Sequence, residues 1–203
     1  MTNLAIFDFD GTLFRSPDRP SWWDDAMNAV GSKRNWWANA YSLNRPCVPD
    51  EPGPEWWVQP TVRAAKKAIS DPDTWAILMT GRAEKFFRYR VPELLKQAGL
   101  NFDEVHLNPG MDKGQFKRRI ILERLARWPD IDQVDIWDDD LDDLKLFVKT
   151  VQDVGRKVTP HPVRVQAHDP ACELPAFTNA PDDLWFSAAR VARRYLQRRG
   201  DSG

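Results

Sequence analysis

Two aspartates, Asp8 and Asp10, stand two residues apart, directly after a short apolar run from Leu4 to Phe7. A spacing of two places both carboxylates on the same side of an emerging strand, because side chains alternate along extended backbone. Carboxylates brought this close repel each other unless a cation lies between them or one of them keeps a proton. The pair therefore predicts a compact acidic pocket.

A second acidic cluster favours a bound cation, and not a retained proton, as the group that relieves the repulsion between Asp8 and Asp10. Five aspartates follow another apolar run, at Asp138, Asp139, Asp140, Asp142 and Asp143. Oxygen ligands without neighbouring histidine or cysteine are typical of Mg²⁺, which commonly leaves room for water and a substrate phosphate. The sequence thus predicts a magnesium site that handles phosphate, and it leaves open which aspartate of the second cluster binds the ion.

The residues around Asp8 fit phosphoryl transfer. Gly11 permits a tight turn in which backbone N–H groups, including that of Thr12, can face an anion. A carboxylate oxygen of Asp8 can attack phosphorus, and Asp10 can donate a proton to the departing oxygen and later accept one from water.

These aspartates meet only if the strands that carry them end at one edge of a sheet. Apolar runs predict strands at 4–7, 74–79, 102–107 and 133–137 and a weaker one at 163–167; periodicity predicts helices at 61–70, 84–98, 113–127, 141–154 and 182–199. The alternation predicts an α/β fold with a Rossmann-like parallel sheet and helices on both faces. In such sheets the ligand binds beyond the carboxyl ends of the strands.

Residues 15–60 do not follow this alternation. They are rich in proline and contain three tryptophan pairs, Trp22-Trp23, Trp36-Trp37 and Trp56-Trp57. We interpret them as a small cap inserted after the first strand of a single domain covering 1–203, with a short helix at 21–30. Two roles for the tryptophans stay open: packing that stabilises the insert, or a stacking platform for unpaired bases.

Composition narrows the class of protein. The 29 basic and 30 acidic side chains leave a net charge of -1, so no global charge attracts nucleic acid. No apolar run reaches the roughly 18 residues of a spanning helix, and no secretory signal is visible, so we expect a cytoplasmic protein without a membrane partner. Cys47 and Cys172 are expected to be unpaired, and the three histidines to be structural or exposed.

Four segments resemble the haloacid dehalogenase (HAD) superfamily of phosphatases. Leu4–Leu13 (LAIFDFDGTL) resembles the first motif, Ile77–Arg82 (ILMTGR) the second, a lysine on the third predicted helix the third, and Ile136–Asp139 (IWDD) the fourth. Thr80-Gly81-Arg82, the Asp138-Asp139 pair and Arg19 are similar to polynucleotide kinase 3'-phosphatase domains. Phe14-Arg15 with Pro17, the tryptophan pairs and Phe116-Lys117 resemble the HAD domains of Swiss Army Knife RNA repair proteins. Asp140 departs from these relatives, which often carry arginine there.

The resemblance implies roles for individual residues. Asp8 would be the nucleophile, Asp10 the general acid/base and Thr80 a donor to the phosphoryl group. Lys117 would be the catalytic cation, with Lys113 as the alternative. The implied substrate-binding residues are Gly11, Thr12, Arg19, Gly81, Arg82 and Lys113; Mg²⁺ would be bound by Asp8, the carbonyl of Asp10, and Asp138 or Asp139, with Asp143 behind them.

The implied activity is a Mg²⁺-dependent phosphatase with an aspartyl-phosphate intermediate. Its expected substrate is a phosphorylated DNA or RNA end, above all a 3'-phosphate, which indicates a polynucleotide 3'-phosphatase of nucleic acid repair. Two alternatives stay open: a phosphatase of nucleotides or small metabolites, and a noncatalytic nucleic-acid-binding module that kept the fold.

Overall fold

The structure is a computed structural model that describes residues 2–20, 23–24, 28, 35–45 and 47–164. The chain divides into two compact units. One contains residues 1–16 and 51–167, and the other contains residues 17–50 and 168–203. Residues 51–60 therefore belong to the unit that holds the sheet, and the predicted cap over 15–60 stays a prediction.

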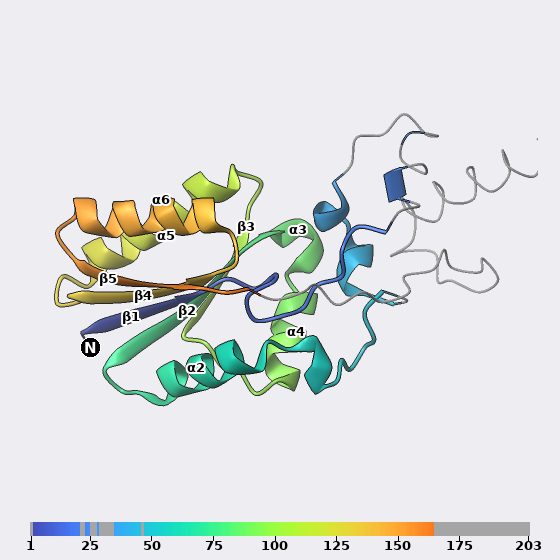
Figure 1. The fold of residues 1–203 in the computed structure, drawn as a ribbon, viewed down its shortest axis with the longest axis horizontal. Helices are drawn as coiled ribbons and strands as arrows, with labels where there is room; N and C mark the ends of the chain where they lie inside the picture. Colours follow the sequence, from blue (N-terminus) through green and yellow to red (C-terminus); the bar gives the residue numbers. More distant parts are fainter. Residues whose placement is uncertain (1, 21–22, 25–27, 29–34, 46, 165–203) are drawn as a thin grey trace, which may run out of the picture. The chain divides into compact units, whose positions relative to one another are not determined.

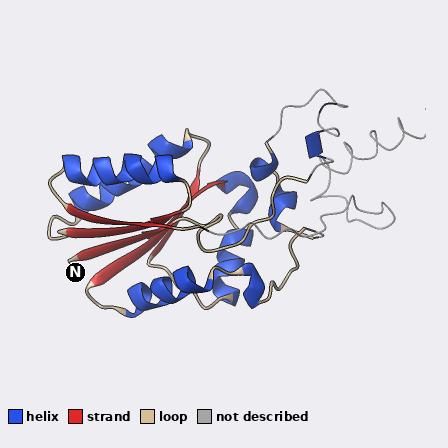
Figure 2. Cartoon of the chain, in the orientation of Figure 1, coloured by secondary structure: helices blue, strands red, loops and turns tan. Residues whose placement is uncertain are grey.

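The first unit is built on a parallel sheet of five strands (Figures 1 and 2). The strands are β1 (Asn3–Phe7), β2 (Thr74–Ala83), β3 (Glu104–Asn108), β4 (Gln133–Asp138) and β5 (Lys157–Pro162), in the order β3-β2-β1-β4-β5. The apolar β1 lies at the centre, where both of its faces are covered. The predicted α/β class with a Rossmann-like parallel sheet is confirmed.

Helices cover both faces of this sheet. They are α2 (Gln59–Ser70), α3 (Glu84–Phe87), α4 (Arg90–Gln97), α5 (Lys113–Arg127) and α6 (Leu141–Asp153). A short 3₁₀ helix lies at Pro54–Trp56 in this unit, and two more lie at Trp36–Ala38 and Ala40–Leu43 in the other unit. α5 and α6 lie on one face, and α2 and α4 lie on the other (Figure 1). One core joins α5 and α6 to the sheet through fully or nearly fully buried side chains such as Ile6, Ile121, Ile136 and Phe147. Burial of each is worth roughly 1.5–3 kcal/mol.

Three of the predicted elements differ from the structure by more than two residues or by a break. The strand expected at 74–79 continues to Ala83, so Thr80, Gly81 and Arg82 lie within β2. The helix expected over 84–98 is interrupted between Phe87 and Arg90, giving α3 and α4. Pro92 explains the break, because its ring would clash with the carbonyl of Arg88 in a continuous helix and it has no N–H to donate.

The last strand lies earlier than expected. It covers 157–162 rather than 163–167, and residues 165–167 lie outside the described residues. A strand at 157–162 was not predicted from the sequence, because Pro160 and Pro162 lower the strand propensity of this segment. Within the described residues β5 is an edge strand that pairs with β4 alone, so both prolines are tolerated, and proline there blocks further strand pairing.

Four of the described tryptophans are buried. Within the second unit, Trp23 and Trp36 pack edge to face with ring centroids 5.2 Å apart, and Trp36 Nε1 donates to the carbonyl oxygen of Pro17. In the first unit, Trp56 and Trp57 pack against Phe14. Burial favours the packing role for these four, whereas Trp37 is partly exposed.

Three further expectations concern the cysteines, the remaining predicted helices and the absence of a membrane span. Cys47 is buried and disulfide-bonded, so the prediction that it is unpaired is wrong. Cys172, Trp22, most of the helix expected at 21–30 and the helix expected at 182–199 lie outside the described residues. Among the described helices, none combines the length and apolar character that a membrane span requires.

Candidate active site

The carboxyl ends of β1 and β4 bring the two acidic clusters together. Phe7 and Trp137 are register partners in the parallel pair, and the N–H of Asp8 donates to the carbonyl oxygen of Trp137 over 3.0 Å. The next residues along the two strands, Asp8 and Asp138, therefore leave the sheet side by side. Both are almost completely buried.

Lys117 joins these two aspartates. Its Nζ lies 2.7 Å from Asp8 Oδ1 and 2.9 Å from Asp138 Oδ2, and its side chain is 2% exposed. α5 presents Lys117 to the strand ends while Phe116, one residue earlier, packs into the core. Burial alone would lower the pKa of Lys117, but Asp8 and Asp138 outweigh it and raise the pKa above its usual range. Lys117 is therefore a fixed cation.

Lys113 occupies a different place. Its Nζ lies 2.8 Å from Asp140 and 2.9 Å from Asp143, and its side chain is 46% exposed. The two lysines therefore occupy different positions: Lys117 contacts Asp8, while Lys113 binds the first turn of α6 at the edge of the carboxylate site. Lys113 also closes over Gly81, where an added Cβ would lie 3.0 Å from the lysine side chain.

Three carboxylates form a cluster with the geometry of a cation site. Asp8, Asp138 and Asp139 each offer an oxygen atom, and these atoms all lie within 4.8 Å of one another. Burial and the neighbouring charges of Asp138 and Asp10 raise the pKa of Asp8, with only Lys117 opposing them. Loss of hydration and the charge of Asp138 raise the pKa of Asp139 to about 6. One lysine does not balance three carboxylates, so this donor set fits Mg²⁺.

The start of α6 sorts the acidic run. Asp140 caps the helix by accepting from the N–H groups of Asp142 and Asp143, and its own N–H donates to Asp138 Oδ1 over 3.0 Å. Asp138 is thereby fixed inward, next to Lys117, and Asp142 is exposed. Asp143 lies between the two lysines, 2.9 Å from Lys113 and 3.9 Å from Lys117, and is not one of the three clustered carboxylates.

Asp10 is held by other partners than Asp8. Arg82 donates to it at two points, with Nη2 2.7 Å from Oδ1 and Nε 3.0 Å from each oxygen. Ser16 Oγ also donates to Asp10, and Thr80 Oγ1 lies 3.5 Å from Oδ2. Burial alone would raise the pKa of Asp10, but the Arg82 guanidinium outweighs it and lowers the pKa below its usual range. Ser16 was not identified from the sequence, because a serine after the first motif gives no distinctive signal.

The turn after Asp10 has the predicted form. Gly11 has φ +67°, a left-handed conformation that favours glycine, and a Cβ there would collide with the Asp139 carboxylate. Thr12 is buried and its Oγ1 donates to Asp139 Oδ1 over 3.3 Å. The turn thus bridges the first and fourth motifs.

Arg19 is the predicted site residue that lies in the other unit. It belongs to the second unit, where it forms an exposed ion pair of 3.1 Å with Asp24. Its predicted contact with substrate stays a prediction.

A parallel sheet with this strand order, an Asp-x-Asp turn at the end of its central strand and a lysine joining both acidic motifs define a HAD-type domain. Residues 18–175 match the family described as HAD domain family 1 in Swiss Army Knife RNA repair proteins, and the chain belongs to this family. The matched stretch includes Thr80, Lys117 and Asp138 and begins after Asp10.

Other similarities are more distant. An uncharacterized protein of Saccharomyces cerevisiae, YMR265C, is 25% identical over 167 residues, which are 72% of this chain and 36% of the yeast protein. The chain thus spans about a third of the length of that relative. Among solved structures, the HAD domain of the Legionella pneumophila effector Lem4 has 16% identity and a TM-score of 0.49, covering 79% of this chain and 85% of the other. A chain of the Pnkp1/Rnl/Hen1 RNA repair complex has the same identity and TM-score, covering 80% of this chain and 43% of its own.

Proposed function

We propose that this protein is a Mg²⁺-dependent phosphomonoester hydrolase that forms a phosphoryl-enzyme intermediate on Asp8. The observation that carries the proposal is the bridge from Lys117 to Asp8 and Asp138. A buried lysine that stays charged fixes the Asp8 carboxylate at the strand end and offers positive charge where a phosphoryl group would arrive. A purely structural acidic turn needs no such arrangement.

The residues divide the chemistry between them. An oxygen of Asp8 attacks phosphorus, and the bond from phosphorus to the ester oxygen breaks. That oxygen takes its proton from the protonated form of Asp10, a form that the lowered pKa of Asp10 favours only at acidic pH. Water then attacks the aspartyl-phosphate, Asp10 takes the proton back, and inorganic phosphate leaves with Asp8 restored. Mg²⁺ bound by Asp8, the Asp10 carbonyl, and Asp138 or Asp139 would neutralise phosphate charge.

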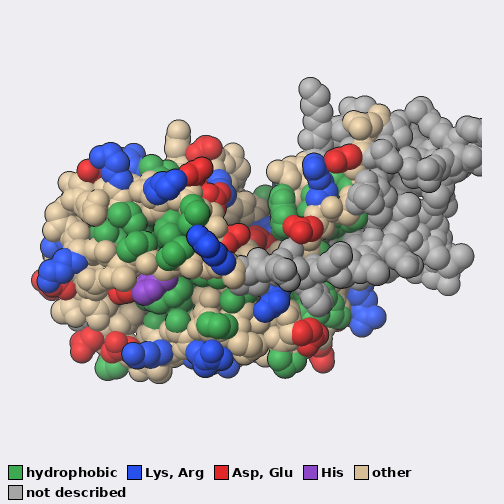
Figure 3. Space-filling view, in the orientation of Figure 1, with side chains coloured by type: hydrophobic (Ala, Val, Ile, Leu, Met, Phe, Trp, Pro, Cys, Tyr) green, Lys and Arg blue, Asp and Glu red, His purple; other side chains and the backbone are tan. Residues whose placement is uncertain are grey.

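We further propose that the substrate is a phosphorylated nucleic-acid end, above all a 3'-phosphate. Support comes from the family, whose description places these domains in RNA repair proteins. Net charge gives no support, because basic and acidic side chains are interspersed over the face shown in Figure 3. Recognition of the nucleic acid therefore depends on local contacts.

One experiment separates the candidate functions. Turnover is measured with Mg²⁺ on an aryl phosphate, on 3'- and 5'-phosphorylated oligonucleotides of RNA and DNA, and on mononucleotides, for the wild type and for Asp8→Asn. The proposal expects the wild type to hydrolyse the aryl phosphate and to have its highest kcat/KM on 3'-phosphorylated ends. It expects no turnover of any substrate by Asp8→Asn. Highest kcat/KM on mononucleotides would indicate a metabolite phosphatase. Oligonucleotide binding without turnover of any ester would indicate the noncatalytic module.

A further inference from the structure

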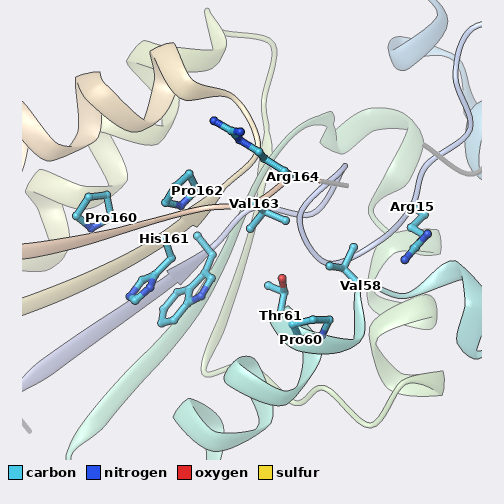
Figure 4. Close-up of a pocket in the computed structure, with 10 residues that line it drawn as sticks. Arg15, Val58, Pro60, Thr61, Pro160, His161, Pro162, Val163 and Arg164 are labelled. Carbon is cyan, nitrogen blue, oxygen red and sulfur yellow. The ribbon is translucent and has the colours of Figure 1, made fainter. Parts of the chain in front are cut away.

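A cavity of about 690 Å³ lies beside the ends of β4 and β5, outside the carboxylate site (Figure 4). Its walls come from the start of α2, from the last residues of β4 and β5, and from Arg15. The volume falls in the range of small-molecule sites and can hold a nucleoside. Two arginines and one histidine line it, and none of the lining residues is acidic. This charge pattern favours an anionic or electron-rich ligand over a cation.

Three stacked rings lead into this cavity. Phe7, Trp137 and His161 are register partners across β1, β4 and β5. Ring centroids lie 4.3 Å apart between the first two and 4.1 Å apart between the last two, with planes within 9° and 7° of parallel. Trp137 and His161 both line the cavity. Flat aromatic surfaces of this kind bind nucleobases by stacking.

The outermost ring is accessible and oriented. His161 lies on the edge strand and its side chain is 35% exposed. Its Nε2 lies 2.7 Å from Asp135 Oδ1, which fixes the rotation of the ring. Figure 4 shows the ring directed from β5 toward the side of the sheet on which Pro60 and Thr61 of α2 lie. A planar group that enters the cavity therefore meets a ring already held in place.

Arg15 supplies an unsatisfied donor. Its Nε is buried and has no hydrogen-bond partner among the described residues. Buried donors of this kind are rare in proteins and call for an acceptor that the described part of the chain does not provide. Phosphate, ribose and base oxygens are suitable acceptors, and an arginine is well suited to phosphate.

The cavity adjoins the carboxylate site along the chain. Arg15 immediately precedes Ser16, which donates to Asp10, and Trp137 immediately precedes Asp138. Consecutive residues are about 3.8 Å apart, and successive side chains of a strand face opposite sides of the sheet. The residues that line the cavity and those of the carboxylate site are thus neighbours in sequence at the ends of the strands.

We propose that this cavity is a subsite for an unpaired nucleobase of the strand whose phosphorylated end occupies the carboxylate site. The base stacks on the face of the His161 ring that does not contact Trp137, and Arg15 donates to the sugar-phosphate backbone. The inference rests on the proposed function and adds to it a specific base-binding surface. A phosphatase of small aliphatic phosphates would have no use for stacked rings beside its site.

The test measures binding and catalysis separately. Binding of a fluorescent single-stranded oligonucleotide with a 3'-phosphate is measured by anisotropy, with Mg²⁺ and in the Asp8→Asn background, and kcat/KM for an aryl phosphate is measured with Asp8 intact. His161→Ala and Arg15→Gln are each expected to weaken oligonucleotide binding about 5- to 100-fold and to leave aryl phosphate turnover unchanged. His161→Phe keeps a ring and is expected to retain binding.

The control variant is Arg63→Gln. It removes the same charge from an exposed position on α2 and is expected to leave binding within about twofold. Unchanged oligonucleotide affinity in His161→Ala and Arg15→Gln, with aryl phosphate still hydrolysed, would overturn the subsite and leave the phosphatase standing. An equal loss in both assays would assign these residues a structural role and also overturn it. Weakened binding without any hydrolysis would support the subsite and refute the phosphatase.

Discussion

The Arg82 guanidinium binds the carboxylate of Asp10 at two points, with its Nη2 2.7 Å and its Nε 3.0 Å from the carboxylate oxygens. The arginine is 1% exposed and its guanidinium lies 4.8 Å from the centre of the Phe87 ring. The family resemblance implied that Arg82 binds substrate, and in the structure it binds Asp10, the proposed general acid/base. Arg82 therefore sets the protonation of Asp10 before any substrate arrives.

We predict that Arg82→Gln shifts the pH profile of kcat/KM for an aryl phosphate toward higher pH. Arg82 lowers the pKa of Asp10 against the opposing effect of burial, so its removal raises that pKa. The limb that reports Asp10 should move toward higher pH. Arg82→Lys keeps the charge and should move it less. A reduced rate with an unmoved profile would show that Arg82 acts on the substrate alone.

The two lysines should differ sharply when each is replaced. Lys117→Met leaves Asp8 and Asp138 buried without their cation, which should lower the free energy of unfolding by about 3–5 kcal/mol and abolish turnover. Lys113→Met removes a half-exposed ion pair at the start of α6, so the change in stability should be small. Urea unfolding and kcat provide the measurements. Equal losses in the two variants would contradict the assignment of Lys117.

The sequence predicted the carboxylates better than their partners. Asp8, Asp10 and Asp138 could be located because strand ends meet at one edge of a parallel sheet, and the order of the apolar runs fixes which ends those are. The choice between Lys113 and Lys117 needed the rotation of α5, which a helical pattern with many basic residues leaves open. The pairing of Arg82 with Asp10 depends on side-chain reach in three dimensions, and no spacing rule predicts it.

The edge strand β5 was not predicted for the same reason: its position depends on three-dimensional packing that the local sequence does not reveal. Pro160 and Pro162 argue against a strand in sequence, since a central strand could not contain them. Only the position of β5 beside β4 shows that their missing N–H groups are harmless. The ring of His161 gains its place on Trp137 from that register, so the stacked rings could not be predicted either.

We predict that Asp8→Asn raises the melting temperature of the metal-free protein while abolishing turnover. Burial and the charges of Asp138 and Asp10 raise the pKa of Asp8, which means that the fold disfavours its ionised form. A neutral amide of the same shape removes that repulsion, and Lys117 keeps its contact with Asp138. Calorimetry in EDTA and turnover of an aryl phosphate test both parts. A lower melting temperature would show that the pairing with Lys117 outweighs the repulsion.

Mg²⁺ should stabilise the protein more strongly as pH rises through about 6. The pKa of Asp139 is raised to about 6, so its carboxylate becomes available to a cation only as the pH passes that value. The metal-free protein should instead become less stable as pH rises toward about 6. A carboxyl group whose pKa is raised by folding favours the folded state while it is protonated, and this contribution to the free energy of unfolding is lost as the group ionises. The increase in melting temperature on adding Mg²⁺ should therefore grow between pH 5 and pH 7 (about one unit on either side of that pKa).

Asp139→Asn provides the control for this pH dependence. The amide cannot ionise, so the gain in melting temperature with Mg²⁺ should be smaller and should vary less with pH across the same interval. Asp142→Asn, at an exposed position of the same acidic run, should behave like the wild type. If Asp139→Asn keeps the pH dependence of the wild type, the ligand that titrates is Asp8, whose pKa is also raised. That result would show that Asp139 does not coordinate the ion.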